Sequence, residues 1–159
     1  MRIVAVLALL LAPACAARLD NKNLEKEIRE GLFDTSGIEA ESVTCETDVE
    51  CKRGRKSRCT AVAEGGEVVL QVTQTDDQCE RRWIVDKGTI SSSKIEDRVE
   101  QAFRDKTGKE AIVDCGRRYR VAVAGRQFDC EIENRKGEEA TIKVTVEDDL
   151  EHVAWNLDL

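Results

Sequence analysis

The sequence predicts an α+β protein of two tandem modules, each with one N-terminal helix packed on a roughly four-stranded antiparallel sheet and stapled by disulfides. Three observations support this. First, the stretch from Leu24 to Val85 recurs from Ile95 to Leu157. Second, each copy begins with apolar residues at helical spacing, followed by segments in which apolar and polar residues alternate as in strands. Third, six of the seven cysteines lie in the copies. At about 65 to 70 residues, a copy is small enough for covalent staples to be common.

The duplication is visible as an offset of 70 to 72 residues between unlike residue types. The matched pairs are Leu24 and Ile95, Ile28 and Val99, Leu32 and Phe103, Cys45 and Cys115, Cys59 and Cys130, and Trp83 and Trp155. Chance would not repeat a helix stripe, two cysteines and a tryptophan in order. We therefore predict a first module at 20–87 and a second at 93–159, with residues 86–92 as a linker rich in glycine and serine.

Each module begins with an amphipathic helix. Between Asn21 and Phe33 the apolar residues fall four apart with charged residues between them, which is the spacing of a buried helix face. In the second copy, Ser93 and Glu96 have the spacing of a capping box, in which each side chain bonds a backbone N–H at the helix start. Gly37 and Gly108 are the expected helix ends.

Strands follow each helix. Ile142, Val144 and Val146 alternate with polar residues, as in a sheet covered on one face only, and Val68, Leu70 and Val72 repeat this in the first copy. Further strands are expected around Phe128 to Ile132, from Val153 to Leu159, and from Ile112 to Cys115 with an extension through Val123. Trp83 and Trp155 are equivalent in the two copies and fall on the inward-facing positions of their expected strands. This favours packing in the core over a role in binding a ligand.

The first residues are expected to be a cleaved signal peptide at 1–17. Arg2 precedes ten apolar residues, Ile3 to Ala12, which are too few to span a bilayer. The segment ending in Ala14-Cys15 resembles a bacterial lipoprotein signal, in which cleavage before Cys15 is followed by lipidation of that cysteine. The alternative is ordinary cleavage at Ala12-Pro13-Ala14. The odd number of cysteines favours the first, because lipidation of Cys15 removes the unpaired thiol.

Composition narrows the classes of partner. The net charge is −7, which argues against a nucleic-acid or anionic-membrane binder as a whole. One segment is nevertheless strongly basic and is a candidate contact with an acidic partner or phosphorylated polymer, although a solvated hairpin tip is the commoner meaning of such a segment. Its residues are Lys52, Arg53, Arg55, Lys56 and Arg58, and Arg117, Arg118 and Arg120 occupy the matching region of the second copy.

Symmetry between the copies predicts the disulfides. Cys45 with Cys59, and Cys115 with Cys130, occupy the same places in each module, so we expect them to pair within modules. Cys51 and Cys79 occur only in the first copy and are expected to bond each other. Six cysteines allow 15 connectivities in principle, so the pairing rests on symmetry.

No catalytic or cofactor pattern is evident. The sequence has no Cys-x-x-Cys pair and a single histidine, His152, from which neither a zinc quartet nor a nucleophile with its base can be assembled. We therefore expect no enzyme activity, no metal and no cofactor.

The first copy contains Val43-Thr44-Cys45, Gly54 and Cys59, and the second contains Val113-Asp114-Cys115, Gly125, Phe128 and Cys130. Through these residues, each copy resembles a family of small bacterial envelope domains of unknown function. Such domains carry a helix, a V-x-C segment, a G-x-x-F-x-C segment and a closing pair of strands. The first copy departs from the pattern at Ser57, where phenylalanine is expected. The resemblance implies an envelope location but no substrate. The architecture is also similar to that of secreted β-lactamase inhibitors built from two such modules.

These expectations favour a non-enzymatic interaction protein of the cell envelope, exported and tethered by a lipid at most. Its partner would be an envelope protein or polymer, bound by the exposed sheet faces and the basic segment. Two alternatives are a secreted inhibitor of a hydrolase and a purely structural lipoprotein.

Overall fold

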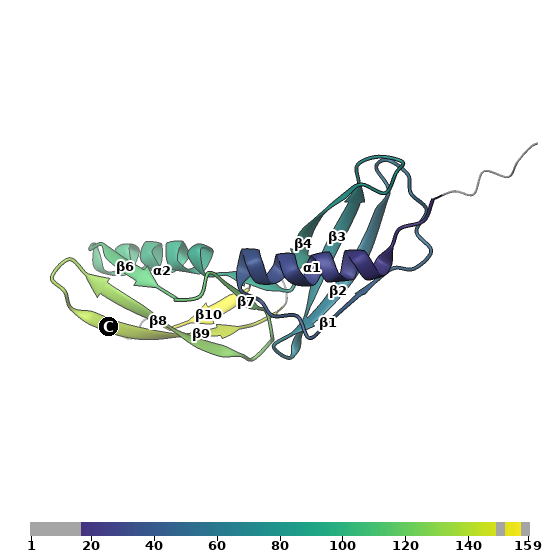
Figure 1. The fold of residues 1–159 in the computed structure, drawn as a ribbon. Helices are drawn as coiled ribbons and strands as arrows, with labels where there is room; N and C mark the ends of the chain where they lie inside the picture. Colours follow the sequence, from purple (N-terminus) through teal and green to yellow (C-terminus); the bar gives the residue numbers. More distant parts are fainter. Residues whose placement is uncertain (1–16, 149–151, 157–159) are drawn as a thin grey trace, which may run out of the picture.

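The computed structural model describes residues 17–148 and 152–156. All of the expected signal peptide except Ala17, including Cys15, and the last residues of the final strand lie outside them. The α+β class and the two tandem modules are confirmed, and each helix lies along one face of the sheet of its own module (Figure 1). No helix in the described part is long and apolar enough to cross a membrane.

The first module consists of α1 and a four-stranded antiparallel sheet. The helix spans Asn21–Ser36 and the strands, in spatial as well as chain order, are β1 (Ser42–Cys45), β2 (Lys56–Ala63), β3 (Gly66–Gln74) and β4 (Arg81–Lys87). The Asp20 carboxylate caps the helix by accepting the Asn23 N–H at 3.3 Å, and Gly37 ends it in the left-handed conformation that glycine adopts without strain. Leu24, Ile28 and Leu32 are buried against the sheet.

The second module repeats this topology. Its helix α2 spans Ser92–Thr107, and its sheet has the order β10 (Val153–Trp155), β9 (Glu139–Val146), β8 (Gln127–Asn134) and β6 (Ala111–Asp114). Ile95, Val99 and Phe103 are buried as expected. Trp83 and Trp155 are each partly buried and pack against the core of their own module.

Three expectations about local structure are wrong. Residues 86–92 are not a linker: they complete β4, form β5 (Thr89–Ser91) and begin α2. The strand from Ile112 does not continue through Val123, because a turn separates β6 from β7 (Tyr119–Val121), which pairs with β5. The capping box is absent, since α2 begins one residue before Ser93 and Glu96 bonds elsewhere.

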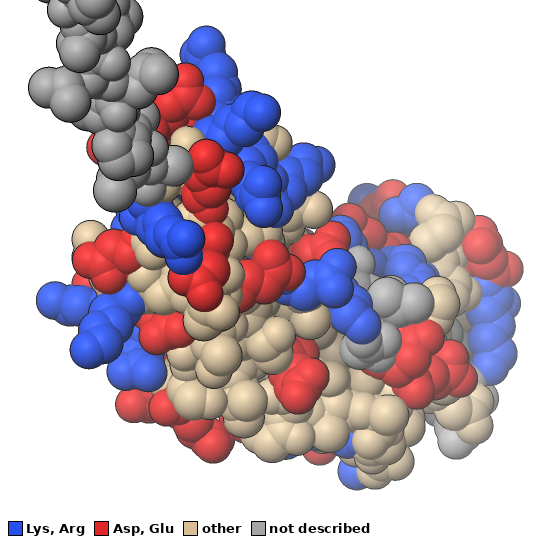
Figure 2. Space-filling model, turned by 90° about the vertical axis from the view of Figure 1, so that its right-hand side faces the viewer, with Lys and Arg blue, Asp and Glu red and all other residues tan. Residues whose placement is uncertain are grey.

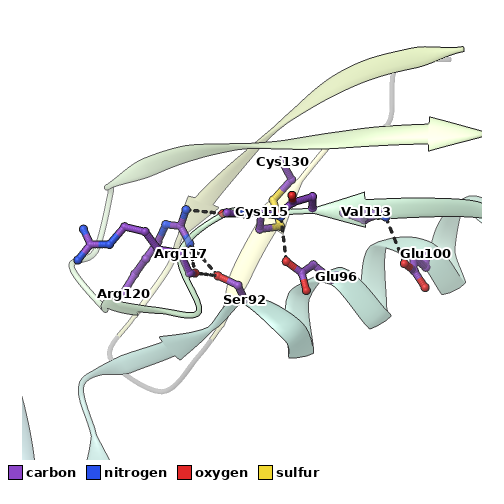
Figure 3. Close-up of a disulfide and its surroundings, with 10 residues drawn as sticks. Ser92, Glu96, Glu100, Val113, Cys115, Arg117, Arg120 and Cys130 are labelled. Carbon is purple, nitrogen blue, oxygen red and sulfur yellow. Dashed lines mark hydrogen bonds between the residues drawn. A yellow bond between two sulfur atoms is a disulfide. The ribbon is translucent and has the colours of Figure 1, made fainter. Parts of the chain in front are cut away.

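The Glu96 carboxylate connects the helix to the sheet, because it accepts the Cys115 N–H at 2.9 Å (Figure 3). Glu25, at the matching position of α1, accepts the Cys45 N–H at 3.1 Å. Each module therefore uses one helical glutamate to satisfy the backbone of the cysteine at the end of its first strand.

Six cysteines form the three disulfides expected from the sequence. Cys45 lies directly opposite Cys59 on the neighbouring strand, with Cα atoms 4.1 Å apart, and Cys115–Cys130 has the same separation. Cys51–Cys79 joins the loop after β1 to the turn before β4. In the chain-entropy model, loops of these lengths are stabilised by roughly 3 to 4 kcal/mol each.

The modules are docked through the turn between β2 and β3. Glu64 and Gly65 both have positive φ, as in the type I′ turn of a two-residue hairpin. The Glu64 carboxylate lies 2.7 Å from Arg117 and 3.3 Å from Arg126 of the second module. Val121 of the second module is itself part of the core cluster of the first.

Candidate functional site

The predicted basic segment is divided between a turn and a strand. Residues 52–55 form the turn, whereas Lys56 and Arg58 begin β2 with Ser57 buried between them. Alternation along the strand therefore places Lys56 and Arg58 on the sheet face that α1 does not cover. Lys52 and Arg55 remain exposed in the turn.

A buried glutamine holds the turn in place. The Gln74 side chain is 2% exposed, accepts the Lys52 N–H at 2.6 Å and donates to the Glu50 carbonyl at 3.2 Å. Arg53 is anchored separately: its backbone N–H donates to Asp77 and its Nε to the Thr75 carbonyl. The Arg53 side chain is therefore bonded within the first module, whereas Lys52 is held there through its backbone N–H.

Strand register brings a further cation and an apolar side chain beside Lys56 and Arg58. Lys56 lies opposite Thr73, which lies opposite Arg82. In the adjacent row Arg58 lies opposite Gln71, which lies opposite Ile84. Ile84 is 59% exposed on the same face. We call Lys56, Arg58, Arg82 and Ile84 the basic face.

Arg82 and Ile84 are not among the residues that the sequence pattern predicts for this surface. Alternation around Trp83 would have placed both side chains on the uncovered face of a strand, but their position beside Lys56 and Arg58 depends on the register of three strands, which no local pattern specifies.

The surroundings of the basic face are polar and lie near the N-terminal end of the chain. A shallow hollow of about 240 Å³ is lined by Glu46, Lys56, Ser57, Arg58 and Gln71. The Cys51 N–H donates to the Ala17 carbonyl at 2.8 Å, so the chain enters the first module beside the basic turn. Figure 2 shows several Lys and Arg side chains gathered at one end of the molecule, with Asp and Glu side chains among them.

The arginines of the second copy have structural partners instead. Arg120 donates to the Ser92 hydroxyl and to the Arg117 and Cys115 carbonyls (Figure 3). Its guanidinium lies 4.3 Å from the centre of the Phe128 ring. Burial, together with the nearby Arg117, lowers the pKa of Arg120 from its ordinary value. Arg117 pairs with Glu64, and Arg118 lies over the Tyr119 ring. The two copies thus use matching basic regions differently.

A larger cleft of about 670 Å³ lies between the modules. Leu32 and Val85 of the first module and Tyr119 of the second form its apolar part, and Lys94 and Arg118 lie at its polar part. Its shape therefore depends on the docking of the modules, and we assign it no ligand.

No group of three or more metal-ligating side chains comes together among residues 17–148 and 152–156. His152 is exposed and bonds Asp148.

A protein-family profile described as a domain of unknown function (DUF4333) matches residues 4–79 and again residues 82–150. No curated protein and no solved structure matches the chain. The two matches cover most of the sequence, one for each copy, with the first ending before β4 and the second beginning within β4 and ending before β10. The chain therefore belongs to the DUF4333 family and carries two consecutive copies of its domain.

Proposed function

We propose that this protein is a non-enzymatic interaction protein of the bacterial cell envelope, and that the basic face of its first module binds an acidic macromolecular partner. The observation that carries the proposal is the placement of three exposed cations and an exposed isoleucine in two adjacent rows of one uncovered sheet face. Guanidinium and ammonium groups beside an apolar side chain suit a partner that presents carboxylates or phosphates around an apolar contact.

Export and lipid anchoring belong to the same proposal. Three disulfides are typical of proteins that fold outside the reducing cytosol. The positive charge, apolar stretch and Ala14-Cys15 at the start of the sequence are the features of an exported lipoprotein. Metabolic labelling with a fatty acid tests the anchor. Label on the wild-type chain that disappears in Cys15→Ser supports it, and an unlabelled wild-type chain contradicts it.

Binding is tested by capture of partners from envelope extract with three forms of the chain. We expect Lys56→Ser/Arg58→Ser/Arg82→Ser to lose at least tenfold in capture of an acidic partner. Lys22→Ser/Lys26→Ser/Arg29→Ser is the matched control, because it removes the same charge from the exposed side of α1.

The identity of what is captured separates the alternatives. A stoichiometric hydrolase whose activity falls on binding would indicate an inhibitor, and no captured partner would indicate a structural lipoprotein. Equal capture by the wild type and the basic-face variant would remove the basic face from the proposal.

A further inference from the structure

The uncovered face of the second sheet has the opposite charge. Its outward side chains also form two adjacent rows. Ile112 lies opposite Glu133, which lies opposite Glu139, and beside them Asp114 lies opposite Glu131, which lies opposite Thr141. All six side chains are exposed, Ile112 by 70%. We call Ile112, Asp114, Glu131, Glu133 and Glu139 the acidic face.

Like charges directly opposite each other on a sheet are destabilising. Glu133 faces Glu139 and Asp114 faces Glu131, so each row places two carboxylates on neighbouring strands. Lys143 lies on the same side of β9, but it is 3.6 Å from Asp129 and outside these two rows. A cationic surface laid on the acidic face would relieve this repulsion.

The acidic and basic faces are opposite in charge and similar in extent, with the cations on β2 and β4 and most of the carboxylates on β8 and β9. Each consists of two adjacent rows, and each contains one isoleucine more than half exposed, Ile84 on the basic face and Ile112 on the acidic face. Contact between the faces would cover both isoleucines, which lie on the edge strands β4 and β6, and would pair the charges beside them.

The two faces do not meet within one chain, because their side chains remain exposed while Glu64 holds the modules in place. We infer that the basic face of one copy binds the acidic face of another, so that the protein associates head to tail. This inference rests on the proposed function, since it takes the basic face to be a contact surface and names the partner as a second copy of this chain.

The expected association is weak. Four strands about 4.8 Å apart and up to nine residues long form a sheet face of roughly 400 Å², so a contact over the whole face buries about 800 Å² in total. Different surfaces meet in such a contact, which therefore forms a closed assembly where the rotation between copies closes and an open chain of copies where it does not. Because the charges are exposed, salt should weaken it strongly.

Sedimentation of the full-length, disulfide-bonded chain provides the test. We expect the weight-average mass of the wild type to rise with concentration at low salt and to return toward that of the monomer at high salt. The basic-face reversal Lys56→Glu/Arg58→Glu/Arg82→Glu and the acidic-face reversal Glu131→Lys/Glu133→Lys/Glu139→Lys should each stay monomeric. The control Lys22→Glu/Lys26→Glu/Arg29→Glu should associate like the wild type. All variants keep residues 1–16, so these cannot cause the differences.

Mixing the two reversals is the decisive step. One variant then carries two acidic faces and the other two basic faces, so the mixture should associate although neither component does. Recovery on mixing also shows that both variants are folded. A wild type that stays monomeric at low salt, association that survives either reversal, or a mixture that remains monomeric would overturn the inference.

Binding to immobilised polyglutamate distinguishes a failure of the self-association inference from a failure of the proposed function. A monomeric chain that binds polyglutamate through the basic face, with binding lost in Lys56→Ser/Arg58→Ser/Arg82→Ser but not in the α1 control, would leave the proposed function standing. Loss of both behaviours would overturn both.

Discussion

Gly31 lies inside α1, where glycine normally costs about 1 kcal/mol relative to alanine. The indole of Trp83 occupies the adjoining space, and a Cβ at position 31 would lie 2.5 Å from Trp83 Cζ2. The second copy has Ala102 at the matching position, and its tryptophan, Trp155, lies beneath the Arg98 guanidinium at 5.0 Å. The absence of a side chain at position 31 thus allows Trp83 to approach the helix closely.

We predict that Gly31→Ala destabilises the protein by about 1 to 3 kcal/mol, although alanine is the better helix former, because overpacking against the partly buried ring outweighs helix propensity. The measurement is the urea midpoint of unfolding with the disulfides intact.

The same substitution in a variant without the Trp83 ring tests whether overpacking against that ring is the cause. In Trp83→Leu the same alanine substitution should be neutral or stabilising, since the ring is gone. Glu30→Ala, on an exposed part of the same helix, should change stability by less than about 0.5 kcal/mol. A stabilising Gly31→Ala in the wild-type background would show that Trp83 moves aside at little cost.

Each helix is joined to the first strand of its sheet by a side-chain bond as well as by apolar packing. Glu25 and Glu96 lie near the start of their helices and accept the N–H of Cys45 and Cys115, the cysteines that close the disulfides. Glu100 adds a second such bond in the second module by accepting the Val113 N–H at 3.1 Å. These bonds fix the edge strand relative to the helix, which apolar contacts alone do less precisely.

We predict that Glu25→Leu lowers the free energy of unfolding by about 1 to 3 kcal/mol, because it leaves the backbone N–H of a buried cysteine without its acceptor. Glu25→Gln should cost less, since the amide oxygen still accepts. Chemical denaturation of the oxidised protein provides the measurement.

The control for this prediction is Glu30→Leu, whose carboxylate is 3.8 Å from Lys26 on the exposed side of α1. Such a pair contributes little, so the stability should change by under about 0.5 kcal/mol. Equal losses at positions 25 and 30 would mean that the bond to Cys45 has no special weight.

The two modules form one docked unit. A Cβ on Gly66 would lie within 2.8 Å of Val121 and Val123, so the start of β3 packs against the second module without a side chain between. Ala122 donates its N–H to the Gly88 carbonyl at 2.9 Å, next to the ion pairs of Glu64. Apolar contact and charge therefore act on the same short segment.

We predict that Glu64→Ala loosens the docking by about 1 kcal/mol while leaving each core intact, because both ion pairs are partly exposed. Hydrogen exchange of the Ala122 amide should accelerate roughly fivefold, whereas amides in the middle of β8 should not change. Glu67→Ala is the control, since Glu67 is exposed and lies three residues away. Unchanged exchange at Ala122 would show that apolar contacts alone hold the modules.

The sequence predicts most of the fold but less of the candidate site. The helix stripes, the helix ends at Gly37 and Gly108, and the cysteine pairs all reflect spacing within one copy or symmetry between copies, which the sequence displays directly. The capping box at Ser93 failed because Glu96 reaches a backbone N–H nineteen residues away, in competition with the local bond. Residues 86–92 failed as a linker because Gly88 fits tightly against β3, where a Cβ would be 2.0 Å from the Glu67 carbonyl oxygen.

By itself, the sequence determined the duplication, the α+β class, the buried stripes and two basic regions, because these follow from residue order and short-range periodicity. Only the tertiary structure decided that Arg117 and Arg120 have internal partners while Lys56 and Arg58 join Arg82 on an open face, and that the second sheet presents carboxylates on its own uncovered face. The physical reason is that neighbours on a surface are set by strand register and by the docking of the modules, which join residues far apart in the chain.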